Sequence, residues 1–182
     1  MLTQCRKPAT PWSSARNSRN ARNGSPTPGH TGSRPSSRFA ATTARELLAN
    51  ALRSLAEVER KLRDADGARR HYEESVAILR NCHDRLRLAH TVRHLGDVHH
   101  DAGRADLAAP CYDEALALYS AHPDPAPLDL ANAIHSMAVL EQEVGDREKT
   151  IALWGQAREL YASLQVDAGV AECTARLAKL GV

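Results

Sequence analysis

The sequence predicts an all-α fold, an α-solenoid of about three and a half antiparallel helix-pair repeats behind a disordered N-terminal tail. Three observations lead to this prediction. Apolar residues recur at spacings of three and four, two turn-bounded segments align without a gap, and a small residue returns at a nearly constant interval. The alternating apolar and polar pattern of a half-buried strand is absent from the sequence, so no β-sheet is expected.

The first 38 residues differ sharply in composition from the rest of the chain. They contain seven basic residues, no acidic residue and five of the nine prolines, whereas the remainder has 17 basic and 22 acidic residues. A segment with so little apolar surface does not offset the entropy lost on ordering. We therefore predict a disordered, basic, Ser/Arg/Pro-rich tail over residues 1–38 and a helical repeat domain over residues 39–182.

Helical periodicity begins just after this tail. Thr43 and Glu46 fit a capping box, in which each side chain bonds a free amide at the helix start. The apolar residues that follow at helical spacing are Leu47, Leu48, Ala51, Leu52, Leu55, Val58 and Leu62. Continued along the chain, the pattern predicts helices near residues 43–63, 67–82, 85–101, 105–120, 128–143, 147–163 and 168–179.

An internal repeat explains the order of these helices. Residues 56–79 align with residues 96–119 without a gap, and Tyr72 then falls on Tyr112. Extending the alignment downstream places Trp154 on the same position. The aromatic residue should fill the space between successive pairs, and a small residue should let the paired helices approach closely. This small residue recurs at intervals of 40, 42 and 40, at Ala56, Gly96, Ala138 and Ala178.

One residue conflicts with a regular repeat. Pro110 falls within the second helix of the second pair, where its ring removes a backbone hydrogen bond and clashes with the preceding turn. We therefore expect either a kink there or a late helix start near Ala108.

These residues resemble the pattern of tetratricopeptide repeat proteins, whose unit is two antiparallel helices. Departures from the pattern place Glu59, His99 and Glu141 where the first helix has an aromatic residue. The unit is also longer than 34 residues, so it resembles the longer repeats of kinesin light chains and bacterial signalling regulators. The second repeat carries the match with Val92, Leu95, Gly96, Ala108, Tyr112 and Ala115.

The resemblance implies a concave groove, lined by the first helix of each pair, that binds a peptide or a partner domain. Glu57 and Asp97 stand where chaperone-binding members carry asparagine, and their charge would repel a terminal carboxylate. We therefore expect a polar or basic peptide. Projected onto this sequence, the groove residues are Asn50, Arg53, Glu57, His90, Arg93, His94, Asp97, Asp101, Asn132, His135 and Gln142.

His90, His94 and Asp97 lie at helical offsets of 0, 4 and 7 and therefore share one face. One interpretation is a zinc or nickel site, since these residue types bind both ions. The other is a solvated groove face without metal or cofactor, and this is the interpretation we adopt. Asp97 should then favour the protonated imidazoles, so that partner binding changes between about pH 6 and 7.5.

The predicted function is protein–protein interaction, as a small scaffold or regulatory module. No nucleophile elbow, phosphate loop or dinucleotide motif occurs, so an enzyme is not expected. The alternative is a nucleic-acid-associated protein that acts through its basic tail. Four widely spaced cysteines favour a reducing compartment, and no apolar run would span a membrane. These features predict a cytoplasmic protein, with organellar targeting by the Arg- and Ser-rich start as the alternative.

Overall fold

The computed structural model describes residues 37–124 and 126–182, and within them it contains seven α-helices and no strand. The all-α repeat fold predicted from the sequence is confirmed. Six of the helices begin and end within three residues of their predicted bounds. The helices are α1 (Ser37–Lys61), α2 (Ala65–Leu79), α3 (Arg85–Asp101), α4 (Ala105–Ser120), α5 (Pro127–Val144), α6 (Arg147–Ser163) and α7 (Asp167–Lys179).

The beginning of α1 differs from the prediction. The helix starts at Ser37, so Thr43 and Glu46 lie inside it and the predicted capping box is wrong. Ser37 and Arg38, which were assigned to the tail, are the first residues of the helix. The predicted disorder of the remaining tail falls on residues 1–36, outside the described residues.

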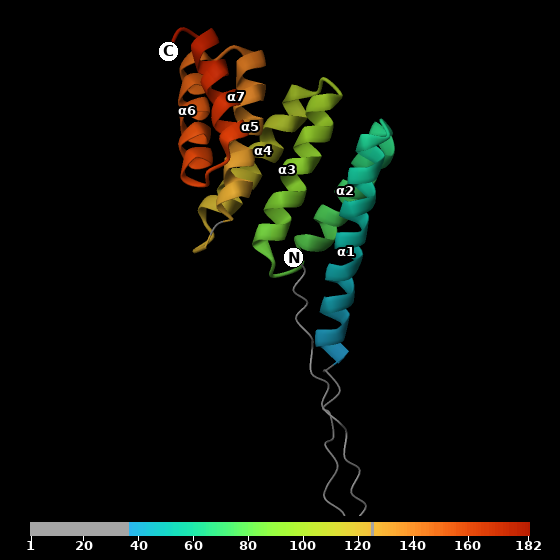
Figure 1. Cartoon of the computed structure of the whole chain (residues 1–182). Helices are drawn as coiled ribbons and strands as arrows, with labels where there is room; N and C mark the ends of the chain where they lie inside the picture. Colours follow the sequence, from blue (N-terminus) through green and yellow to red (C-terminus); the bar gives the residue numbers. More distant parts are fainter. Residues whose placement is uncertain (1–36, 125) are drawn as a thin grey trace, which may run out of the picture. The chain divides into compact units, whose positions relative to one another are not determined.

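The helices form antiparallel pairs that stack in chain order (Figure 1). Within pairs, α1 packs on α2, α3 on α4, and α5 on α6. Between pairs, α2 packs on α3, α4 on α5, and α6 on α7, while α3 also touches α5. The first helices of successive pairs therefore form one layer and the second helices form the other. None of the helices in the described part of the chain has the length and apolar character that a membrane span requires.

Local signals at the helix ends set these boundaries. The carboxylates of Asp64, Asp84 and Asp146 each accept a hydrogen bond from a backbone amide three residues downstream, at 2.9–3.0 Å. Such caps satisfy amides that a helix leaves free at its start. At its far end, α5 stops at Gly145, whose φ of 103° is a left-handed conformation that glycine adopts without strain.

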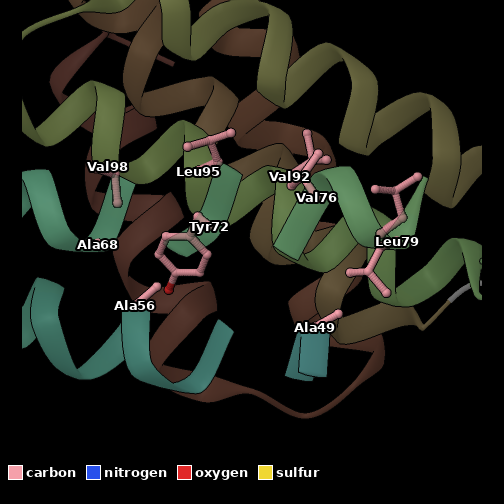
Figure 2. Close-up of a cluster of buried hydrophobic side chains, with 10 residues drawn as sticks. Ala49, Ala56, Ala68, Tyr72, Val76, Leu79, Val92, Leu95 and Val98 are labelled. Atoms are coloured by element: carbon pink, nitrogen blue, oxygen red, sulfur yellow. The ribbon is translucent and has the colours of Figure 1, made fainter. Parts of the chain in front are cut away.

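The three repeat aromatics pack as predicted. Tyr72, Tyr112 and Trp154 are at most 1% exposed. In the first pair, Tyr72 of α2 points toward α1, and its hydroxyl end lies beside Ala56 (Figure 2). The small position thus makes room for the aromatic ring. Because burying an aromatic ring contributes several kcal/mol, these contacts hold the pairs together.

Two positions of the second helices where the repeat has a small residue hold Ser75 and Thr150, and both hydroxyl groups are hydrogen-bonded. Ser75 is buried and donates a hydrogen bond to the carbonyl of Ala49 on α1, at 2.8 Å. Thr150 is also buried and donates to the carbonyl of Asp146 one turn earlier, at 2.6 Å. A buried hydroxyl is costly only when it lacks a partner, so these residues do not disturb the stack.

Pro110 does not delay the start of its helix. The α4 helix begins at Ala105 and continues through Pro110 to Ser120, so the expectation of a late start near Ala108 is wrong. The ring of Pro110 lies on the exposed side of α4, away from the buried Ala108 and Tyr112. The stacking surface of the helix therefore keeps its regular spacing despite the missing amide.

Candidate functional site

An open pocket of about 620 Å³ lies where α1, the start of α3 and the start of α5 come together. Three of the predicted groove residues, Asn50, Arg53 and His90, line it. The pocket therefore spans the first helices of all three pairs. Its other lining residues are Asp84, Leu86, Arg87, Ala126 and Asp129.

Arg53 is the pocket cation with the weakest internal partner. Its guanidinium lies 4.0 Å from Glu57, and Glu57 also accepts a hydrogen bond from Lys61 at 2.9 Å. That bond lowers the pKa of Glu57 and engages its charge. In contrast, Arg87 lies 3.1 Å from Asp84. The positive charge of Arg53 is thus the one most available to a ligand.

His90 does not carry the charge that the sequence analysis expected. Burial, together with the nearby His94 and Arg93, lowers its pKa to about 4. Its ring meets that of His94 edge-on, with centroids 4.5 Å apart. The predicted protonated state is therefore wrong for His90, because burial disfavours the cation more than the charge of Glu57 favours it.

Arg93, His94 and Asp97 form a closed network. Arg93 Nη1 donates to Asp97 at 3.1 Å, and Arg93 Nη2 lies 2.8 Å from His94 Nε2. A guanidinium only donates, so Nε2 of His94 must accept and Nδ1 must carry the hydrogen. Nδ1 then donates to Asp97 at 3.1 Å. Arg93, which is 8% exposed, offers little surface to a partner.

Asp97 also connects three helices. In addition to its α3 partners it accepts hydrogen bonds from Tyr112 of α4 at 3.1 Å and from Ser136 of α5 at 3.3 Å. Burial by itself would raise the pKa of Asp97, but the hydrogen bond from His94 and the charge of Arg93 outweigh it and lower the pKa to about 2. The carboxylate is therefore held ionised and links α3 to α4 and α5.

The histidine face offers no ready metal site. Both ring nitrogens of His94 are engaged, Nδ1 by Asp97 and Nε2 by Arg93. Within the described residues, no group of three His, Cys, Asp or Glu side chains is arranged to hold a metal ion. The hydrogen bonds among Arg93, His94 and Asp97 instead hold these side chains in fixed positions along the groove.

A second, more basic pocket lies near the end of α1. It has a volume of about 390 Å³ and is lined by Arg60, Lys61, Arg63 and Asp101. Arg60 donates to Asp101 at 3.0 Å, which joins α1 to α3. Arg63 has no ion pair with the other described residues. Asp101, predicted as a groove contact, is thus partly neutralised within the domain.

The predicted groove residues of the third pair are engaged with second-helix aromatics. Asn132 accepts a hydrogen bond from the Tyr161 hydroxyl at 2.7 Å, and Gln142 accepts one from the Trp154 indole at 3.2 Å. The ring of His135 meets Trp154 edge-on at 5.0 Å. None of the three lines the pocket that contains Arg53.

Sequence reasoning missed the pocket residues contributed by helix starts. Asp84 and Arg87 flank the beginning of α3, and Asp129 lies in the first turn of α5. The projection from the repeat pattern covered only the middle of each first helix. An N-cap signal was present at Asp84, since a side chain of this type commonly caps a helix.

Comparison with known proteins identifies the repeats. A model of the tetratricopeptide repeat family matches residues 47–121, which comprise most of α1 and all of α2, α3 and α4. These helices carry the similarity to tetratricopeptide repeats. Such repeats generally mediate protein–protein interaction and are typically not catalytic. A search of curated proteins found no match.

The fold of this chain is also similar to that of solved structures. One match is the crystal structure of BtubC (BKLC) from P. vanneervenii. The TM-score is 0.61 at 22% sequence identity, with 69% of this chain and 52% of that chain covered. This chain thus spans about half the length of BtubC, and at this identity the similarity concerns the fold alone.

Proposed function

We propose that the tetratricopeptide repeats bind an acidic segment of a protein partner along the first helices. The observation that supports this most directly is the open pocket across α1, α3 and α5 that presents the weakly neutralised Arg53. Arginine recognises carboxylates with two parallel hydrogen bonds, and Asn50 in the same pocket adds an amide donor.

The internal ion pairs change the partner expected from the sequence. Asp97 and Asp101 each lie within 3.1 Å of an arginine of the domain, so their charges are already balanced. Arg53 and Arg63 remain with weak or no ion pairs among the described residues. The groove is therefore effectively more basic than its composition indicates, and it favours an acidic peptide over the basic one first expected.

Asp129 adds a second requirement at the α5 side of the same pocket. Its carboxylate suits a hydrogen-bond donor on a neighbouring residue of the partner. The chemistry of the pocket thus favours a segment in which an acidic side chain meets Arg53 and an adjacent donor meets Asp129. His90 between them is neutral above about pH 5 because burial lowers its pKa to about 4, so it adds no charge.

Degenerate libraries of about nine-residue peptides, with the central residue fixed as Glu, Gln or Lys, test this proposal. We expect the purified chain to retain the Glu library most strongly. Arg53→Ala should reduce that retention to the level of the Gln library. Arg70→Ala is the control, because Arg70 is exposed on the second-helix layer. Strongest retention of the Lys library, or an Arg53→Ala variant that behaves like wild type, would contradict the proposal.

A further inference from the structure

The α1 helix exposes a continuous stripe of large apolar side chains that no other described residue covers. Ala51 lies on the same stripe and is also exposed. Among the described residues, five of the nine large apolar side chains with high exposure lie on this helix or, for Leu62, directly after its last residue. They are Leu47 (64% exposed), Leu48 (50%), Leu55 (45%), Val58 (51%) and Leu62 (74%).

The corresponding positions of α3 show what such a stripe packs against. The positions in α3 that correspond to Leu48, Leu55 and Val58 are buried, with Leu88 and Val98 each 1% exposed. In α3 these positions are covered because α2 packs against that helix. The stripe on α1 is therefore a stacking face that lacks the helix normally packed on it.

The spacing of the stripe indicates that its occupant is a helix. Residues 48, 51, 55, 58 and 62 follow alternating steps of three and four, which is the seam of a two-helix coiled coil. No charged residue interrupts the seam. Exposed apolar patches of several hundred Å² on otherwise polar surfaces usually mark interaction sites.

The sequence of residues 1–36 lacks the pattern that such an occupant needs. Their large apolar residues are Met1, Leu2 and Trp12, and they include five prolines. A helix that covers the stripe must place four or five large apolar side chains at heptad spacing. The sequence of this segment contains no such pattern.

We propose that the stripe is covered by α1 of a second copy of this chain, in a twofold antiparallel dimer. Leu55 is the midpoint between Leu48 and Leu62, so it would lie near the axis and meet Leu55 of the partner subunit. Leu48 would meet Leu62 of the partner subunit. A twofold axis needs a self-complementary patch, and Leu48 and Leu62, seven residues to either side of Leu55, provide one.

The area of the stripe sets the strength of this dimer. Pairing two stripes removes roughly 1,000 Å² of surface from water in total, near the lower limit for a specific interface. We therefore expect a reversible dimer with a dissociation constant in the micromolar range. The groove residue Arg53 faces a different side of α1, so the proposed dimer leaves the peptide-binding pocket accessible.

Sedimentation velocity of the full chain, from about 1 to 200 µM, tests the proposal. The wild type should shift from monomer to dimer across this range. Leu55→Glu should remain monomeric, because it places two carboxylates near the axis. Leu107→Glu is the matched control, since Leu107 is 41% exposed on α4, away from the stripe, and this variant should dimerise like wild type.

Mixing Leu55→Glu with Leu55→Lys tests the symmetry of the dimer. Each variant alone should be monomeric, and the mixture should recover association through a Glu–Lys contact near the axis. Circular dichroism confirms that each variant is folded, and Leu62→Glu replaces Leu55→Glu if the latter unfolds. A wild type that is monomeric at every concentration, a Leu55→Glu dimer as tight as wild type, or a mixture that stays monomeric overturns the proposal.

Discussion

Gly96 and Tyr112 are in such close contact that a methyl group on Gly96 would lie 2.6 Å from the tyrosine ring. The ring cannot move away easily, because it is buried and its hydroxyl donates to Asp97 at 3.1 Å. The small residue of the second pair is therefore required by the aromatic residue that the repeat places opposite it. This contact fixes the distance between α3 and α4.

The variant Gly96→Ala should consequently destabilise the protein. Overpacking a rigid core typically costs about 1–3 kcal/mol, which exceeds the roughly 1 kcal/mol that alanine gains in helix propensity. Gly155→Ala is the matched control, since Gly155 also lies within a helix but has no atom within 4 Å of an added methyl group. Urea unfolding should show a lower free energy of unfolding for Gly96→Ala and a slightly higher one for Gly155→Ala. Equal effects would contradict the packing argument.

Trp154→Ala should lower the free energy of unfolding by about 3–5 kcal/mol, the usual cost of removing a large side chain from a core. Trp154 is fully buried, and its indole donates a hydrogen bond to Gln142 at 3.2 Å. Chemical denaturation monitored by circular dichroism measures the change. A loss below about 1 kcal/mol would mean that the aromatic position of the third pair does not hold the stack.

The stabilising role of Asp97 should appear as a pH dependence of stability. Its folded pKa of about 2 lies below the ordinary value of 3.8, so the ionised form stabilises the fold. This contribution is complete above about pH 5 and is lost as the pH falls through 2. The stability difference between wild type and Asp97→Asn should therefore shrink between pH 5 and 2. Asp66→Asn, at an exposed carboxylate, serves as the control.

His90 should titrate outside the physiological range. Burial lowers its pKa to about 4, so its NMR signals should shift with a midpoint near that pH and stay constant between pH 6 and 7.5. Partner binding should then show no pH dependence from His90 in that window. A midpoint near 6.5 would mean that the side chain is more solvated than its packing against His94 indicates.

The sequence was sufficient to predict the helices and their pairing because the repeat imposes its spacing on residues that must touch. Tyr72, Tyr112 and Trp154 recur opposite small residues, and this arrangement has one simple packing solution. The start of α1 was missed because Thr43 and Glu46 also fit a capping motif that the longer helix does not use.

The candidate site was harder to predict, because charge pairing depends on three-dimensional neighbours. The repeat pattern placed Arg93 and Asp97 on the groove face, but it did not show that they bond each other. Periodicity likewise identified the apolar residues of α1 without distinguishing the face that packs on α2 from the face that remains exposed. Leu55 and Ala56 are adjacent in sequence, yet the first is exposed and the second buried.

The most direct test of the proposed function is a charge reversal at Arg53. Wild-type protein should retain the Glu peptide library over the Lys library by about fivefold, which corresponds to roughly 1 kcal/mol. Arg53→Glu should invert this order, because residue 53 would then add a carboxylate to those of Asp84 and Asp129 in the pocket. Arg70→Glu, of equal charge change outside the pocket, should keep the wild-type order. An unchanged preference in Arg53→Glu would show that this pocket does not bind the partner.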